Sequence, residues 1–157
     1  MRGKLDELDF KIIRHICTGV YSYDELAELC NVGRNTVYRR INKLERMGIV
    51  TRRVMAVPNF EKLGLSAVIV GINLNFQDMD KTLNFLKKYP GVMLICKTYG
   101  EHDLVFILLC GREDVGSCVL KLRKALDDLK VQISDFDVSI SISWDKLEFP
   151  IPTGLQS

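Results

Sequence analysis

The chain has 157 residues, of which 47% are hydrophobic and 27% are charged, and such proportions are usual for a globular protein with a buried core. No apolar run approaches the roughly 18 residues that a membrane-spanning helix requires, and the opening residues lack the apolar core of a secretory signal. These observations predict a cytoplasmic protein without a membrane anchor.

The cysteines and histidines give little indication of metal or redox chemistry. Five cysteines are spread along the chain without a Cys-x-x-Cys pair, namely Cys17, Cys30, Cys96, Cys110 and Cys118. Because free cysteines outside secreted proteins are mostly buried, we interpret them as small hydrophobic core residues rather than as metal ligands or a disulfide. His15 and His102 are the only histidines, so we expect no metal site and no cofactor.

The net charge is only +2, but the basic residues are concentrated in one stretch. Residues 34–53 contain seven arginines and lysines and a single acidic residue, Glu45. A nearly neutral protein with one basic stretch is typical of a local binding surface for a polyanion such as nucleic acid. Charge alone does not distinguish such a surface from the solvated face of an ordinary helix.

The first fifty residues are predicted to form three helices. Apolar residues at helical spacing mark the first helix; they are Leu5, Leu8, Ile12 and Ile16. Ser22 followed by Glu25 matches a capping box, which opens a second helix over residues 23–30. The turn that follows contains Asn31 and Gly33, which both tolerate a left-handed backbone conformation. It leads to a third helix, from about residue 34 to residue 47. Two helices joined by so short a turn are typical of a DNA-binding helix-turn-helix.

The second half of the chain changes to a pattern of strands and helices. Residues 67–76, 92–99, 103–110 and 136–144 are predicted strands, and residues 78–91 and 112–129 are predicted helices. This βαββαβ order is that of the ferredoxin-like fold. The third strand has an unbroken apolar run, so we expect it at the centre of the sheet and buried on both faces. Both helices then cover one face of the sheet, and the other face is the expected dimer surface.

The predicted fold is therefore α+β, with a helix-turn-helix domain of the winged type followed by a ferredoxin-like domain. The boundaries that we expect are a helix-turn-helix domain over residues 1–50, an extended linker over 51–65, a ferredoxin-like domain over 66–149 and a tail over 150–157.

The third helix places a narrow apolar stripe opposite a basic and polar face. Val37, Ile41 and Leu44 form the stripe, which has to pack on the first two helices. The opposite face suits the major groove, where Arg pairs with guanine, Asn pairs with adenine and a Thr methyl contacts thymine. We assign base or groove-edge contacts to Arg34, Asn35, Thr36, Arg39 and Arg40, with Tyr38 beside them, and phosphate contacts to Lys43, Arg46, Arg52 and Arg53.

These residues resemble the N-terminal domain of the leucine-responsive regulatory protein/AsnC family of transcription regulators. The matches follow the family's L-D-x-x-D opening, its E-L-A motif and its R-R-I-x-x-L-E-x-x-G motif; they are Leu5, Asp6, Asp9, Glu25, Leu26, Ala27, Arg39, Arg40, Ile41, Leu44, Glu45 and Gly48. The βαββαβ half resembles the family's effector-binding and oligomerisation domain. Two features depart from the family: Gly33 stands where a serine often caps the helix, and the loop before the second helix lacks the usual basic residue.

The resemblance implies a sequence-specific regulator that binds double-stranded DNA, is not an enzyme, and forms homodimers and in many members octamers. It also implies an amino-acid effector in a cleft near the turn before the third strand. By position, that cleft involves Tyr99, Gly100, Glu101, His102 and Asp103, with Ser139, Ser141 or Ser143 of the last strand. Turn amides would accept the effector's carboxylate, and Glu101 or Asp103 would hold its ammonium group. The same turn residues are equally typical of a solvated hairpin.

Two other functions are compatible with the sequence. Sirohaem decarboxylases share this two-domain organisation, but they would need a tetrapyrrole pocket with basic residues or histidines, and the predicted sheet domain offers only His102 as a histidine. The other alternative is a protein-interaction module that retains the helix-turn-helix for packing alone.

Overall fold

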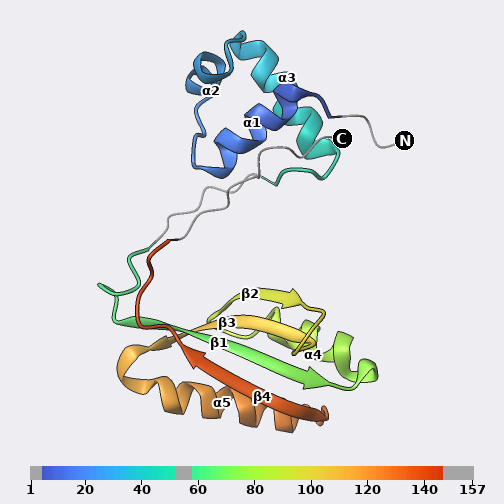
Figure 1. Cartoon of the computed structure of the whole chain (residues 1–157), viewed down its shortest axis with the longest axis vertical. Helices are drawn as coiled ribbons and strands as arrows, with labels where there is room; N and C mark the ends of the chain where they lie inside the picture. Colours follow the sequence, from blue (N-terminus) through green and yellow to red (C-terminus); the bar gives the residue numbers. More distant parts are fainter. Residues whose placement is uncertain (1–4, 52–57, 147–157) are drawn as a thin grey trace. The chain divides into compact units, whose positions relative to one another are not determined.

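The computed structural model describes residues 5–51 and 58–146, which fall into two compact units. One unit contains three helices, and the other contains a four-stranded sheet with two helices (Figure 1). Arg52 and Arg53, with their expected phosphate contacts, lie outside the described residues, as does part of the predicted linker. Within the described ranges, no helix is long and apolar enough to cross a membrane.

The helical unit consists of α1 (Glu7–Cys17), α2 (Tyr23–Cys30) and α3 (Arg34–Arg46), which confirms the three predicted helices. Its core draws on all three helices and consists of Ile12, Ile13, Ile16, Leu26, Cys30, Val37, Ile41 and Leu44. Each helix therefore buries one apolar stripe, and the inward stripe of α3 fixes which of its side chains face outward.

The start of α1 carries a complete capping box that was not predicted from the sequence. The Asp6 carboxylate accepts a hydrogen bond of 2.9 Å from the backbone N–H of Asp9, and the Asp9 carboxylate accepts one of 3.2 Å from the N–H of Asp6. At the predicted box of α2, the Ser22 hydroxyl accepts a longer hydrogen bond, of 3.4 Å, from the N–H of Glu25. These caps satisfy backbone groups that have no partner in the first turn of a helix.

The turn between α2 and α3 uses left-handed backbone at one residue. Asn31 ends α2 at φ 55° and ψ 49°, a conformation that Asn and Gly tolerate better than other residues. Gly33 has an extended backbone, with φ −70° and ψ 147°, and α3 begins after it without a side-chain cap. The expected left-handed conformation is therefore used at Asn31 and not at Gly33.

The second unit has the ferredoxin-like order of elements. Along the chain these are β1 (Leu65–Leu74), the 3-10 turn η1 (Phe76–Asp78), α4 (Met79–Leu86), β2 (Val92–Lys97), β3 (Leu104–Gly111), the 3-10 turn η2 (Arg112–Asp114), α5 (Val115–Asp128) and β4 (Ile133–Ile140). The strands lie in the order β2-β3-β1-β4, and every neighbouring pair is antiparallel. The fold class predicted from the sequence is confirmed.

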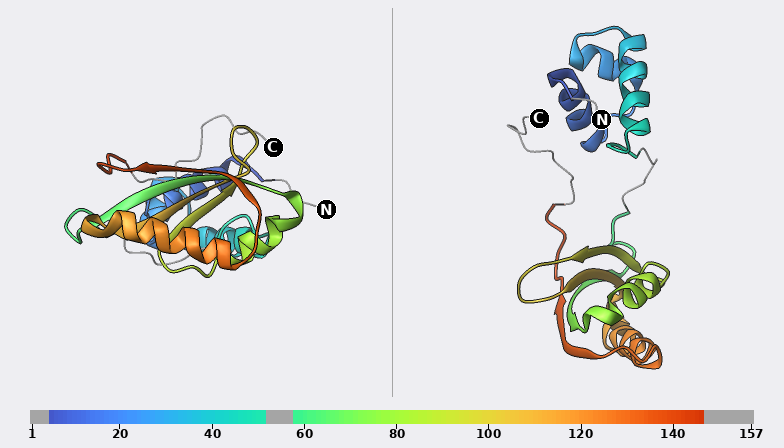
Figure 2. Two further views of the ribbon diagram at one scale, coloured as in Figure 1. Left: turned by 90° about the horizontal axis from the view of Figure 1, so that it is seen from below. Right: turned by 90° about the vertical axis from the view of Figure 1, so that its right-hand side faces the viewer.

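Helices α4 and α5 cover the same face of the sheet, as the left view of Figure 2 shows. The core between helices and sheet is built from alternate strand residues such as Val70 and Phe106, together with Leu86 of α4 and Leu122 of α5. The opposite face of the sheet, which we call the open face, has no layer upon it within the described part of the chain. Ile69 in β1 and Leu94 in β2 are 42% and 45% exposed there.

The position of β3 is as predicted, but its burial is not. It lies between β2 and β1, and Leu104, Phe106 and Leu108 are buried against the helices. The alternate residues, such as Ile107, are only half-buried because they lie on the open face. The expectation of burial on both faces does not hold within the single chain, since an unbroken apolar run does not show whether a second layer belongs to the same chain.

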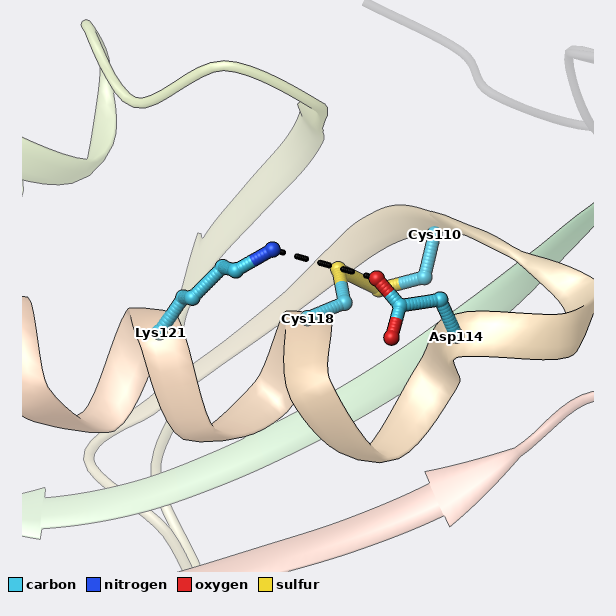
Figure 3. The surroundings of a disulfide bond; sticks show 4 residues. All are labelled: Cys110, Asp114, Cys118 and Lys121. Atoms are coloured by element: carbon cyan, nitrogen blue, oxygen red, sulfur yellow. Dashed lines mark ion pairs between the residues drawn. A yellow bond between two sulfur atoms is a disulfide. The ribbon is translucent and has the colours of Figure 1, made fainter.

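The interpretation of all five cysteines as free core residues is also wrong. Cys110, near the end of β3, forms a disulfide with Cys118 in α5 (Figure 3). Cys96 is exposed in β2, Cys30 is buried and Cys17 is half-buried. Both cysteines of the disulfide lie on inward positions of their elements, and η2 turns the chain so that these positions meet.

Candidate nucleic-acid interface

The buried apolar stripe of α3 determines which side chains of this helix face solvent. Val37, Ile41 and Leu44 are at most 1% exposed, and this anchors the helix against α1 and α2. The residues on the other side surround a hollow of about 700 Å³ on the surface of the helix; its lining consists of Thr36, Tyr38, Arg39, Arg40, Asn42, Lys43 and Arg46. The structure thus brings most of the predicted DNA-binding residues onto one surface.

Three of the predicted base-reading side chains are available for contacts. Asn35, Thr36 and Arg39 are exposed at the N-terminal half of α3. Within the described residues, the side chains of Asn35 and Arg39 make no hydrogen bond or ion pair. In a helix-turn-helix, this end of the second helix enters the major groove.

Arg40 and Lys43 are held by carboxylates of α1. The buried carboxylate of Asp9 accepts a hydrogen bond of 3.1 Å from Arg40 and one of 2.8 Å from Lys43, and Arg40 also pairs with Asp6. These bonds raise the pKa of the Arg40 guanidinium, Asp6 contributing most. The pKa of Asp6 is lowered, first by the backbone hydrogen bond from Asp9 and further by Arg40. Both basic side chains therefore connect α3 to α1.

Other predicted residues of α3 also have neighbours inside the domain. Arg34 pairs with Asp24 at 3.1 Å, although both side chains are largely exposed. The ring of Tyr38 packs edge-on against Tyr23, with centroids 5.7 Å apart. The Arg46 Nε donates a hydrogen bond of 3.2 Å to the backbone oxygen of Asn42. None of these contacts is buried enough to prevent the side chain from turning to a phosphate.

The predicted effector residues lie around the turn between β2 and β3, but one of them is already used by the fold. The Asp103 carboxylate accepts a hydrogen bond of 3.0 Å from the N–H of Leu74, and its own N–H donates to the side chain of Asn73 at 2.9 Å. Glu101 and Tyr99 are exposed, as is Gly100 between them. Of the two acidic residues predicted to hold an ammonium group, Glu101 is exposed, whereas Asp103 is half-buried with its carboxylate hydrogen-bonded to Leu74.

His102 lies on the open face of the sheet, over Gly71 of β1. A Cβ built on Gly71 would come within 2.6 Å of the Nε2 of His102, so the imidazole ring fills the space that a side chain at position 71 would need. The same Nε2 lies 3.5 Å from the carboxylate of Asp137. Ser139 pairs with Ile69 on this face, whereas the Ser141 hydroxyl donates to the backbone oxygen of Ser143 at 2.7 Å.

Comparisons with known proteins agree with this arrangement. Residues 5–51 match the family model for winged helix-turn-helix DNA-binding domains. Over 112 residues the chain is 30% identical to the HTH-type transcriptional regulator PH0061 of Pyrococcus horikoshii, which covers 70% of this chain and 75% of that protein. It is also 29% identical over 107 residues to the HTH-type transcriptional regulator FL11 of Pyrococcus furiosus, covering 67% of this chain and 70% of FL11.

Solved structures share the whole fold. The crystal structure of PH0061 superposes with a TM-score of 0.80 at 27% identity, covering 95% of this chain and 99% of that one. AsnC of E. coli superposes with a TM-score of 0.70 at 23% identity, covering 91% and 95%. A transcriptional regulator of Neisseria meningitidis, NMB0573, which was crystallised in complex with L-methionine, gives 0.78 at 21% identity, covering 96% and 97%.

Fold, basic helix and relatives together define a DNA-binding transcription regulator of the helix-turn-helix class. Within that class, the chain belongs with the HTH-type transcriptional regulators that include PH0061, and its fold is also that of AsnC.

Proposed function

We propose that this chain is a cytoplasmic regulator that reads DNA with the N-terminal half of α3, with Arg39 as its principal base-reading residue and with Asn35 and Thr36 beside it. The observation that carries this proposal is that Arg39 points outward, without a side-chain partner among the described residues, on a helix whose opposite face is buried. An arginine that is not used inside the domain can make two hydrogen bonds to guanine in the major groove.

In this proposal, the other basic residues of α3 have different roles. Arg40 and Lys43 position the helix through Asp9, although their remaining donors can still reach a phosphate. Arg46, exposed at the C-terminal end of the helix, contacts the DNA backbone, whereas Arg34, exposed at the N-terminal end, keeps its predicted base or groove-edge contact. Phosphate contacts strengthen binding to all sequences and make it dependent on salt, whereas base contacts select the sequence.

The test is to select binding sites from random duplex DNA and to measure affinity for the selected site by gel shift. Arg39→Ala should lower affinity for the selected site by about tenfold or more and should leave non-specific binding much less affected. Arg112→Ala, an exposed arginine of the sheet unit, is the matched control and should bind like the wild type. If Arg39→Ala binds the selected site with unchanged affinity, α3 does not read bases through this residue.

We also propose that the chain dimerises through the open face of the sheet. This face carries apolar side chains including Ile69, Leu94 and Ile107, flanked by Ser139 and Asp137 at the β4 edge. A glutamate in place of Ile107 should shift sedimentation of the protein towards the monomer, because a charge would be buried in the interface. Leu120→Glu, at a position of α5 that is 70% exposed, serves as the control. Assembly of dimers into an octamer would appear in the same sedimentation experiment as a larger species.

We propose, finally, that an amino acid binds near the turn between β2 and β3 and modulates assembly. Exposed Glu101 supports this, because its carboxylate can pair with an α-ammonium group, and so does the complex of the structural neighbour NMB0573 with L-methionine. Calorimetric titration with each of the twenty standard amino acids tests it, with Glu101→Gln as the variant that should lose binding.

An absorbance spectrum of the purified protein tests the enzymatic alternative, since a tetrapyrrole would give an intense Soret band.

A further inference from the structure

The two residues of the disulfide differ in their exposure to solvent. Cys110 is 2% exposed, whereas Cys118, which also packs against the core, is only half-buried. Their Cα atoms are 5.9 Å apart, within the range of ordinary disulfides. A molecule that approaches from solvent therefore reaches Cys118 before it reaches Cys110.

A hollow of about 430 Å³ opens beside this disulfide. Its lining joins the loop after α4, the end of β3 and the first turns of α5, namely Tyr89, Pro90, Leu109, Cys110, Gly111, Asp114, Cys118 and Lys121. Figure 3 shows Lys121 and Asp114 reaching towards each other beside the sulfurs, with 3.8 Å between their charged atoms. The hollow is thus large enough for a small thiol and has a polar rim.

The surroundings of Cys118 favour its thiolate. Cys118 is the fourth residue of α5, close to backbone N–H groups whose partial positive charge stabilises an anion. Lys121 lies one turn further on and adds a positive charge, which Asp114 partly offsets. Cys110, in contrast, is surrounded by the apolar core of the sheet, where a thiolate is disfavoured. In the reduced pair Cys118 is therefore the nucleophile, whereas in the oxidised pair attack at Cys118 follows from its greater exposure.

We propose that the Cys110–Cys118 pair is a thiol–disulfide exchange site that is attacked at Cys118 and that accepts a small dithiol as its reductant. The thiolate of the reductant attacks the Cys118 Sγ, a mixed disulfide forms, and the bond between Cys118 and Cys110 breaks. The Cys110 sulfur leaves as a thiolate and takes up a proton. The second thiol of the reductant then closes a disulfide within the reductant and releases Cys118, so that two electrons pass to the pair.

The fold explains why a dithiol is required. Cys110 is held in the central strand β3, so after the first step its thiol stays close to the mixed disulfide on Cys118. Its effective concentration there exceeds that of a dilute monothiol in solution, and it re-forms the original bond. A dithiol escapes this competition because its own second step is also intramolecular.

Opening of the disulfide removes a restraint at the beginning of α5. Asp114 at the N-cap makes no side-chain capping hydrogen bond, and the three-residue turn η2 is all that separates the helix from β3. The remaining anchors near this end are the hydrogen bond of 2.8 Å from the N–H of Arg112 to the oxygen of Gly64, the exposed Lys121–Asp114 ion pair and the packing of Val115 and Val119 on the core. Reduction should therefore increase amide hydrogen exchange in the first turn of α5.

The first test uses the full chain, prepared without reductant and then exposed to equal thiol concentrations of cysteine or dithiothreitol. After an acid quench, the protein is redissolved in denaturant at mildly alkaline pH with excess iodoacetamide, which alkylates the free thiols, and the remaining cysteines are reduced and labelled with N-ethylmaleimide for mass spectrometry. We expect the pair to stay oxidised in millimolar cysteine and to be reduced in dithiothreitol. Equal reduction by both reagents, no reduction of the folded protein by dithiothreitol, or free thiols at both positions before treatment would each overturn the proposal.

The second test locates the attacked sulfur. In a Cys96→Ser background, which removes the exposed free thiol, Cys110→Ala leaves Cys118 alone and Cys118→Ala leaves Cys110 alone. Glutathione disulfide should add a glutathionyl group to Cys118 in the first variant and react far more slowly in the second. Cys17 and Cys30 serve as internal references, because burial raises the pKa of each thiol. Equal labelling of the two folded variants, with unchanged circular dichroism, would contradict the proposal.

Discussion

The ammonium group of Lys43 in α3 donates a hydrogen bond of 2.8 Å to the carboxylate of Asp9 in α1, whose side chain is completely buried. Arg40 donates to the other oxygen of the same carboxylate at 3.1 Å. A carboxylate removed from water requires such compensation. Two residues on the basic surface of α3 therefore also help to hold the helix-turn-helix together.

This relationship predicts an asymmetry between variants. Replacing Arg40 and Lys43 together with methionine should lower the free energy of unfolding of the helical unit by about 3–5 kcal/mol, because it leaves a buried carboxylate without a cationic partner. Asp9→Asn should cost about 1–3 kcal/mol, since the remaining cations are partly exposed and can turn to solvent. Urea denaturation followed by circular dichroism measures both. Equal losses for the two variants would mean that Asp9 is not buried in solution.

A second prediction concerns acid. The pKa of Asp6 is lowered in the folded chain, first by the backbone hydrogen bond from Asp9, so the unfolded chain binds a proton to this residue more readily. The resulting stabilisation is complete above the ordinary pKa of 3.8 and is lost as the pH falls through the lower, folded value. The urea concentration at the midpoint of unfolding of the helical unit should therefore decrease as the pH is lowered below about 4. Asp6→Asn should make this fall shallower, and an unchanged profile would exclude Asp6 as a contributor.

A third prediction concerns the start of α3. Gly33 caps this helix with an ordinary extended backbone, and a Cβ there would meet only Thr36 Oγ1, at 4.0 Å. Gly33→Ser should therefore stabilise the helical unit by roughly 0.5–1 kcal/mol, through a capping hydrogen bond and a less flexible unfolded chain. Gly48→Ser is the matched control and should destabilise, because Gly48 has a φ of 68°. Thermal unfolding compares the two; a lower melting temperature for Gly33→Ser would contradict the prediction.

The sequence predicted the helices, the strands and the inward stripe of α3, because each depends on periodicity within a short segment. The role of Arg40 depends instead on how α1 packs against α3, since its partner Asp9 lies 31 residues away. A signal was nevertheless present. Asp9 falls between Leu5 and Ile12 on the apolar side of α1, and an acidic residue on a core face needs a basic partner.

The disulfide was missed for a related reason. Cys110 belongs to the alternating residues of β3 that face the helices, and Cys118 belongs to the inward stripe of α5, so each taken alone is typical of a core residue. Only the tight connection through η2 brings the two positions together. Periodicity predicted the face on which each cysteine lies, but not the distance between them.

The last prediction follows from the contact between Gly71 and His102. A Cβ at Gly71 would overlap the imidazole, so Gly71→Ala should force the ring away from Asp137 and destabilise the sheet unit by about 1–3 kcal/mol, the usual cost of overpacking. Alanine is otherwise the better residue within a strand. In a His102→Ala background, the same Gly71→Ala substitution should therefore stabilise the protein. A double-mutant cycle of denaturation free energies measures this reversal of sign, and additive effects would show that the ring does not rest on Gly71 in solution.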